Sequence, residues 1–299
     1  MPAPCPKPMP YDIVHHMKDK YSAVWISYSS ISDYLKCPRA YYLKNIYRDP
    51  KTNNKLSLMQ PALALGQAVH DVLESLSLKP QDERFVIPLV DQLEEKWKRV
   101  HGEMGGFTSE AQEEEYKQRA KDMLARVDSH RGPLTKKAIK IRQELPFYWF
   151  SEEDNIILCG KIDWLEYIES SDSVRIIDFK TGKYDEDPDS LQLPMYLLLA
   201  ANCQNRPVTG AQYWYLGHDN EPVDVSLPSL DEAKTRVEEV AKRVVLARKL
   251  ERFVCKNKDG CPVCRPYELI VSGQAKYVGL GTTRKQDVYI IPKKVPTEE

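Results

Sequence analysis

The sequence lacks the features of a membrane or secreted protein. No apolar run approaches the roughly 18–20 residues that a helix needs to cross a bilayer. The first ten residues, MPAPCPKPMP, alternate prolines with other residues and contain no apolar segment of the kind found in a secretory signal. We therefore expect a cytoplasmic, intracellular protein with no membrane partner, which begins with a flexible arm over residues 1–24.

An excess of charge of either sign is also missing, since 43 Lys and Arg stand against 44 Asp and Glu, for a formal net charge of −1. A nucleic-acid partner would therefore have to be held by a local basic patch and not by a global field. No Walker A motif occurs, so the chain carries no helicase motor of its own. With 42% hydrophobic residues, the chain can nevertheless bury a sizeable core.

The seven cysteines are an odd number in a chain without an export signal, which argues against a disulfide framework. Cys255, Cys261 and Cys264 lie within ten residues, in a C-x5-C-x2-C spacing, and Cys37 stands alone near the start. Four thiolates can bind zinc or an iron–sulfur cluster, and spacing alone does not choose between them. A third interpretation is that Cys37 is an ordinary core residue.

Two kinds of periodicity divide the chain. Helical spacing is clear in PALALGQAVHDVLESLSL, and two charge-mixed helical segments follow at 83–100 and 109–130, separated by GEMGGF. From Ala138 the segments AIKIRQELPFYWF, NIILCGKIDWLEYI and SVRIIDFKTG are typical of strands, and ESSDS is suited to a hairpin turn.

The rest of the chain continues this mixture of helices and strands. A helix is predicted over about 188–202, an antiparallel pair in GAQYWYLG and PVDVSL, a long helix opened by Ser229 or Asp231, and an edge strand in DVYIIP. In the first part, Ser29 or Ser30 is expected to open a short helix, and Pro38 a second one. This order predicts an α+β fold with a small mixed, mainly antiparallel sheet flanked by helices.

Carboxylates occur at two places in the predicted hairpin. Asp163, in GKID, is expected near the end of the first strand, and Asp178 near the end of its partner. Two such carboxylates can converge on one divalent cation, and Mg²⁺ prefers oxygen ligands of this kind. Lys180 lies two residues after Asp178, so it points to the same face of the strand. It can orient or deprotonate a water, or stabilise charge on a phosphate.

Other polar residues can complete this site. His70, in GQAVH, makes Mn²⁺ a plausible alternative to Mg²⁺. Glu144, in RQEL, is a possible further acid, and Gln192 and Tyr196 share one helix face at i and i+4. Each feature alone is usually structural, and a D-x-K on a strand is usually a surface ion pair of little energetic weight. The order of the whole set favours a site.

The segments GQAVH, GKID, DFKTGK and QLPMY, in this order, resemble the RecB-like nuclease motifs of the PD-(D/E)XK superfamily. SYSSISDYLKCPRAYYL is similar to the N-terminal helix of that family, and the resemblance extends over about 27–268. It implies an α/β/α core like that of restriction endonucleases. We therefore expect a single RecB-like nuclease domain over 25–270, with a helical insertion at 83–135 and a C-terminal tail at 271–299.

The same resemblance implies the roles of individual residues. One or two Mg²⁺ or Mn²⁺ ions would be bound by His70, Asp163 and Asp178. Lys180 would assist the attack of water on the phosphodiester, while Gln192 and Tyr196 would position the site or the DNA. The expected catalytic set is therefore Asp163, Asp178, Lys180, Gln192 and Tyr196.

The resemblance also bears on the cysteines. Cas4-like and AddB-like nucleases have one Cys before the core and three after it, which hold a 4Fe–4S cluster that joins the two ends of the chain. The resemblance implies such a cluster here, with Cys37 joined to a Cys-rich segment at 251–268. The familiar order places the close C-x2-C pair first, whereas here the single Cys255 comes first. Zinc therefore remains an alternative, and in either case the role would be structural.

The expected activity is that of a metal-dependent exonuclease on single-stranded DNA ends, as in many relatives. The basic and aromatic runs RGPLTKKAIKIR, YYLKNIYR and TTRKQDVYIIPKK suit a single strand. End processing in DNA repair, recombination or CRISPR adaptation would fit, with a helicase or an integrase-type partner. The alternative is a non-catalytic DNA-binding subunit of a helicase–nuclease or integration complex, against which the intact Asp163, Asp178 and Lys180 argue.

Overall fold

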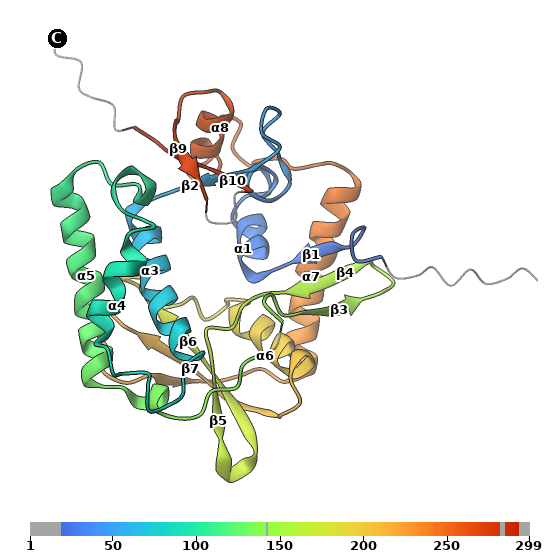
Figure 1. Ribbon diagram of the computed structural model, residues 1–299. Coiled ribbons are helices and arrows are strands. Elements are labelled where there is room, and N and C mark those ends of the chain that lie inside the picture. The colour runs from blue at the N-terminus through green and yellow to red at the C-terminus, as the bar shows by residue number, and fades with distance from the viewer. Residues whose placement is uncertain (1–18, 142, 282–284, 293–299) are drawn as a thin grey trace, which may run out of the picture.

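The computed structural model describes residues 19–141, 143–281 and 285–292 (Figure 1). Residues 1–18 of the expected arm, and 282–284 and 293–299 of the expected tail, lie outside the described residues. The described chain is a mixed α+β fold in which small sheets are flanked by helices, so the predicted fold class is confirmed. No helix in these described ranges is both long and apolar enough to cross a bilayer.

The largest sheet has four strands in the order β5-β6-β7-β8. β5 (Trp164–Ile168) and β6 (Ser173–Lys180) form the antiparallel hairpin that was predicted around ESSDS. A 3-10 turn (Glu169–Ser171) leads to Asp172, whose φ of 44° is left-handed and lets the chain reverse. The hairpin therefore places the start of β5 beside the end of β6.

A helical crossover links the next two strands of this sheet. β6 pairs in parallel with β7 (Val208–Tyr215), and α6 (Gln192–Cys203) connects the two. β7 then pairs antiparallel with β8 (Val223–Val225), as GAQYWYLG and PVDVSL predicted. The carboxyl ends of β6 and β7 thus meet at one edge of the sheet.

Alternation along β6 decides which helices cover each face of the sheet. Ile177 and Phe179 belong to one buried cluster with the helices of the first half of the chain, whereas Val174 and Ile176 belong to a second cluster with later helices. The first face is covered by α3 (Pro61–Leu76), α4 (Leu89–Trp97) and α5 (Glu110–Ser129), and the second by α6 and α7 (Leu230–Lys249). This is the α/β/α layering that the resemblance implied.

The segment 83–135, which was expected to be a helical insertion, contains α4 and α5, with short 3-10 turns at Gly102–Gly105 and Gly132–Thr135. The GEMGGF break is imposed by Gly106, whose φ is +80°. A Cβ at this position would lie 2.8 Å from the Cα of Gln60, so only glycine fits. Ser229 caps α7 through a capping box with Glu232, one of the two starts expected for that helix.

Two smaller sheets differ from the single sheet that was expected. One has the order β1-β4-β3 and contains β1 (Val24–Ile26), β3 (Phe147–Ser151) and β4 (Ile156–Cys159). The predicted continuous strand NIILCGKIDWLEYI is wrong, because β4 pairs in this sheet while β5 pairs with β6. The chain changes sheets between Gly160 and Asp163.

The other small sheet has the order β2-β10-β9, formed by β2 (Lys55–Leu58), β9 (Lys276–Leu280) and β10 (Gln286–Ile290). DVYIIP does form a strand, but the prediction of an edge strand is wrong because β10 lies in the middle. It pairs in parallel with β2, which is more than 200 residues earlier in the chain. Residues of the expected tail are therefore paired with the N-terminal half.

The N-terminal helices lead to a cysteine. α1 (Tyr28–Lys36) is capped by Ser27 in a box with Ser30, so the expected opening at Ser29 or Ser30 is wrong by two or three residues. α2 (Pro38–Tyr41) begins at Pro38 as predicted and continues as a π-helical turn (Tyr42–Ile46). Cys37 lies between α1 and α2, and α8 (Arg265–Val271) follows the other clustered cysteines.

Candidate active site and four-cysteine centre

Asp163 and Asp178 face each other across the β5–β6 hairpin. Trp164 pairs with Ile177, so the residue before β5 lies beside the residue after Ile177. The expectation that Asp163 ends a strand is wrong: it directly precedes β5, because antiparallel strands bring the end of one beside the start of the other. Its Oδ2 accepts a hydrogen bond of 2.9 Å from the backbone N–H of Phe179, which fixes the carboxylate.

α3 brings His70 and Glu74 to the same place. His70 Nδ1 lies 3.3 Å from Asp163 Oδ2. Ligand atoms of His70, Glu74 and Asp163 all lie within 4.8 Å of one another, a group that does not include Asp178. Sequence reasoning missed Glu74, although it follows His70 by four residues and so shares its helix face. The proposed further acid Glu144 is exposed and lies outside this group.

Crowded negative charge perturbs the titrating groups. Burial and the charge of Asp163 raise the pKa of Asp178 to about 7, and they also raise the pKa of Glu74. Burial alone would lower the pKa of His70, but the carboxylates of Asp163 and Asp178 raise it to about 9. The site therefore has an excess of acceptor oxygens that a cation would compensate.

Lys180 lies between two carboxylates. Its Nζ is 2.9 Å from Asp178 Oδ2 and 2.6 Å from Glu186 Oε2, and it donates to the side-chain oxygen of Gln192. Burial would lower the pKa of Lys180, but the charges of Asp178 and Glu186 raise it. The ammonium also lies 4.7 Å from the ring centroid of Tyr213.

Gln192 connects the lysine, the carboxylate and the tyrosine. Its Nε2 donates to Asp178 Oδ1 at 2.9 Å and to Tyr196 Oη at 3.2 Å, while its oxygen accepts from Lys180. Both polar atoms of the amide thus have partners. Only this orientation of the amide places its oxygen toward the Lys180 ammonium and its nitrogen toward the Asp178 carboxylate. The structure brings Gln192 and Tyr196 onto the face of α6 that covers the end of β6, as expected, and both are buried.

The donor set suits a divalent cation. Buried Asp178 Oδ2 forms an ion pair with Lys180 but has no hydrogen-bond partner among the described residues, so lone pairs remain for a ligand. Carboxylates with one imidazole are ligands that Mg²⁺ and Mn²⁺ accept. A cation would also relieve the repulsion that raises the pKa of Asp178.

A cavity of about 340 Å³ opens beside these carboxylates. Glu74, Asp163 and Glu144 line it, together with four cations: Lys96, Arg99, Lys140 and Lys161. Lys161 lies 4.0 Å from Glu74, and Arg99 lies 3.7 Å from Asp71, so two of the cations have acidic neighbours. The cavity can therefore admit a phosphate next to the carboxylates.

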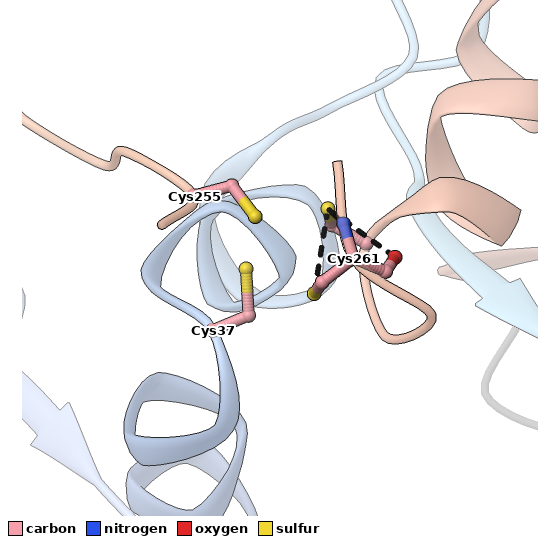
Figure 2. A group of neighbouring side chains, drawn as sticks. Cys37, Cys255 and Cys261 are labelled. Atoms are coloured by element: carbon pink, nitrogen blue, oxygen red, sulfur yellow. Dashed lines mark hydrogen bonds between the residues drawn. The ribbon is translucent and has the colours of Figure 1, made fainter. Parts of the chain in front are cut away.

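The four clustered cysteines meet at the C-terminal end of α1, where Cys37 follows the last helical residue. The Sγ atoms of Cys37, Cys255, Cys261 and Cys264 all lie within 4.8 Å of one another, and none forms a disulfide. Figure 2 shows Cys37, Cys255 and Cys261 with their sulfurs turned toward a common space. Cys37 and Cys264 are buried, and Cys261 Sγ lies 3.7 Å from Cys264 Sγ. Cys37 is therefore buried, as the core-residue interpretation expected, but its thiol also belongs to the four-cysteine group.

The surroundings of the thiols suit metal ligands. Burial raises the pKa of Cys37 to about 12. For Cys261, burial also acts to raise the pKa, but backbone N–H groups of Cys264 and Val263 lower it to about 7. The same junction holds a bidentate pair between Arg39 and Glu268, at 2.6 and 3.1 Å. Four sulfurs with backbone donors fit a closed thiolate site.

Comparisons with known proteins identify the family of the chain. The model of a family described as the PD-(D/E)XK nuclease superfamily matches residues 25–267. Ten chains of solved structure match, including one described as a "Putative exonuclease" from Eubacterium rectale. That structure has a TM-score of 0.49 and 14% identity, over 87% of this chain and 94% of its own. No curated protein matches. Because the family match spans most of its length, the chain belongs to the PD-(D/E)XK nuclease superfamily.

Proposed function

We propose that this nuclease is a metal-dependent deoxyribonuclease and that it degrades DNA from single-stranded ends. The observation that carries the proposal is the intact set around β6, in which Gln192 binds both Asp178 and Lys180 and Asp163 lies across the hairpin. A non-catalytic relative would have no reason to keep the buried Asp178 together with Asp163 and Lys180, which are 9% and 14% exposed, since burying charges costs free energy. The DNA-binding-subunit alternative is therefore disfavoured.

The proposed metal ligands are His70, Asp163 and Asp178, with Glu74 as a further candidate from the observed group. A bound Mg²⁺ or Mn²⁺ ion supplies charge neutralisation for the phosphate and lowers the pKa of a coordinated water. Asp163 is held ready for this role by Phe179 N–H, so little reorganisation is needed.

Lys180 supplies a fixed positive charge beside the scissile phosphate. Two carboxylates keep its Nζ protonated, so we assign it charge stabilisation and orientation and not proton removal. Gln192 orients both Lys180 and Asp178, and Tyr196 supports the amide of Gln192. These residues would form one unit in which the loss of any member disturbs the others.

The single-stranded substrate is supported by the cavity beside Asp163. Of the basic runs, RGPLTKKAIKIR contributes Lys140 to its lining, whereas Lys136 is paired with Glu166 at 2.7 Å. In YYLKNIYR, Lys44 forms an ion pair with Asp33. The run TTRKQDVYIIPKK lies partly outside the described residues. Lys96 and Arg99, from the helical insertion, are cationic residues that sequence reasoning had not placed here. A flexible single strand is better suited than a duplex to a cavity of this size.

The four-cysteine centre is proposed to hold a metal. The resemblance to Cas4-like and AddB-like nucleases supports a 4Fe–4S cluster. Zinc has its own support: tetrahedral Zn–S bonds of about 2.3 Å place sulfurs about 3.8 Å apart, and Cys261 and Cys264 show 3.7 Å. Iron and zinc analysis of anaerobically purified protein, with the visible absorption spectrum, distinguishes the two.

End processing in DNA repair, recombination or CRISPR adaptation is proposed on the resemblance alone. The absence of a Walker A motif supports a helicase partner in the first two settings, and an integrase-type partner fits the third.

The experiment uses anaerobically purified protein and linear single-stranded DNA labelled at either end, with Mg²⁺ or Mn²⁺. We expect metal-dependent release of one label first, which gives the polarity, and no degradation of circular single strands or blunt duplexes. Lys180→Ala should lose activity, while Lys183→Ala, an exposed lysine of the same loop, should keep it. If wild type and Lys180→Ala are equally inert yet bind DNA, the binding-subunit alternative replaces this proposal.

A further inference from the structure

Lys180 has a second carboxylate partner that belongs to none of the motifs. Glu186 lies six residues later, in the segment between β6 and α6, and its Oε2 is 2.6 Å from Lys180 Nζ. The Glu186 side chain is only 18% exposed. It is not among the group of possible metal ligands, so its partners are the lysine and the groups that hold Glu186 itself.

Glu186 is held at its carboxylate and at its backbone. Tyr28 Oη donates to Glu186 Oε1 at 2.9 Å, and Ser190 Oγ donates to Tyr28 Oη at 3.1 Å. The backbone N–H of Glu186 donates to Tyr215 Oη at 3.1 Å, at the end of the neighbouring strand β7. Tyr28 is the first residue of α1, where the Ser27–Ser30 capping box fixes the helix start. The carboxylate of Glu186 is therefore anchored to a helix, and its backbone to a strand.

The position of Glu186 matters because a lysine side chain has four rotatable bonds, and its ammonium is attracted to nearby anions. Without Glu186, the anion left in contact with Nζ would be Asp178, which the proposed function assigns to the metal. The ammonium would then move closer to Asp178 and compete with the cation. Glu186 attracts the ammonium from its other side, which limits the hold of Lys180 on Asp178 and keeps lone pairs of Asp178 for the metal.

We propose that Glu186 and Tyr28 are positioning residues for the catalytic lysine: Tyr28 holds Glu186, and Glu186 holds Lys180 Nζ between itself and Asp178. This inference rests on the proposed nuclease function. It assigns a role to the N-terminal helix in the chemistry, although that helix contributes no group that touches the substrate.

The test uses Glu186→Gln, Tyr28→Phe and the double variant in the full chain. Asp185→Asn is the matched control, since Asp185 is an exposed acid of the same loop. We expect kcat on single-stranded DNA to fall about tenfold in Glu186→Gln and about threefold in Tyr28→Phe, because a displaced group loses alignment with the reacting atoms. KM, and the Kd for DNA measured in a chelator, should not change, and Asp185→Asn should match wild type.

The double variant gives the sharper readout. If Tyr28 acts through Glu186, the double variant should be no slower than Glu186→Gln alone, whereas independent structural effects would multiply. The proposal is overturned if kcat is unchanged in both single variants, if KM and Kd rise as much as kcat falls, or if the two effects multiply. If Glu186→Gln does not fold, Tyr28→Phe decides alone, because it removes one hydroxyl and keeps the ring.

Failure of this proposal can be told apart from failure of the proposed function. A wild-type protein without nuclease activity would overturn the proposed function and this inference with it. An active wild-type protein with unaffected Tyr28→Phe and Glu186→Gln variants would overturn this inference alone.

Discussion

The carboxylate site and the four-cysteine centre lie at opposite ends of α1 and differ in nearly every physical property. The first offers carboxylate oxygens and an imidazole beside a cavity of about 340 Å³, where burial and the charge of Asp163 raise the pKa of Asp178 to about 7. The second offers four thiols, of which Cys37 and Cys264 are buried. Catalytic metal sites keep positions open for substrate, whereas structural sites are closed by protein ligands. The contrast supports the proposal that the first site carries out the chemistry and that the second stabilises the fold.

One helix connects the two regions. Tyr28, the first residue of α1, donates to Glu186, the partner of Lys180, and Cys37 follows the last turn of the same helix. The cysteine centre also joins segments more than 200 residues apart in the sequence. Perturbing each site should therefore give a distinct signature, activity for the carboxylates and stability for the cysteines.

The largest effect is expected for Asp163→Asn, which keeps an acceptor for Phe179 N–H but removes a charge from the site. Activity should fall about a thousandfold, the upper range for the loss of one electrostatic group. The pKa of His70 should fall from about 9 toward its ordinary value, because the Asp163 carboxylate is the nearest charge that raises it. A proton NMR titration of His70 measures this, and exposed Asp172→Asn is the control. An unchanged His70 titration would contradict the observed pairing.

The next effect concerns stability. Cys264→Ser should abolish binding of the proposed metal and lower the thermal unfolding midpoint by about 10 °C, because ligation of a closed thiolate site contributes to folding free energy. Residual activity at low temperature should persist per folded molecule. Cys203→Ser, a cysteine outside the centre, should retain both metal and midpoint. Full activity loss with an unchanged midpoint would place the cysteines in the chemistry and break the contrast between the two regions.

The pH dependence of metal binding gives a third test. If Asp178 is a ligand, Mn²⁺ has to displace its proton, whose pKa is about 7, so this group alone should raise the affinity about fivefold from pH 6 to pH 7 and about twofold more by pH 8. Displacing the proton of His70, whose pKa is about 9, should make the rise steeper over the same range. Isothermal titration calorimetry at pH 6, 7 and 8 measures it. An affinity that is flat over this range would show that the buried carboxylate is not a ligand.

Stability without metal should run in the opposite direction. The folded pKa of Asp178 lies above its unfolded value of 3.8, so charging this residue destabilises the fold as pH rises from about 4 to 7. The folded pKa of His70 is raised from 6.5 to about 9, so its stabilisation is complete below pH 6.5 and is lost as pH rises through 9. Thermal melts in a chelator at pH 6 and pH 9 should therefore show a lower midpoint at pH 9. A higher midpoint at pH 9 would contradict both assignments.

The smallest effect is expected for Glu74→Gln. Glu74 belongs to the observed group with His70 and Asp163, but it lies at the border of the cavity and its side chain is 34% exposed. Metal affinity should fall about threefold to tenfold, measured by the same calorimetry. Glu144→Gln, which changes another acid that lines the cavity, should have no effect on metal affinity. Equal effects of the two substitutions would mean that only overall charge matters.

Local patterns predicted much of this architecture and part of the site. The hairpin β5–β6 and the pair Asp178 and Lys180 follow from strand alternation and a turn, which involve near neighbours in sequence. The roles of His70 and Gln192 came from the resemblance, because no periodicity shows that α3 and α6 meet at the end of β6. Glu74 had a local signal, its four-residue spacing from His70, which went unused.

Other features could not be read from local patterns because their partners are distant. Tyr28 and Glu186 are 158 residues apart, and no local pattern in the sequence connects them. β10 pairs with β2 across more than 200 residues, so its central position in a sheet depended on a partner that the DVYIIP pattern does not specify. The break between β4 and β5 likewise depends on distant partners, because the two halves of one apolar run pair in two different sheets.

Mn²⁺ binding and DNA cleavage measured together at pH 8 in one variant, Asp178→Asn, test whether Asp163 and Asp178 hold the cation that supports hydrolysis. We expect Asp178→Asn to fold with a midpoint no lower than wild type in a chelator, because it removes the repulsion with Asp163. It should nevertheless lose both Mn²⁺ binding and cleavage of single-stranded DNA. A variant that still cleaves DNA at the wild-type rate would contradict this role of Asp178.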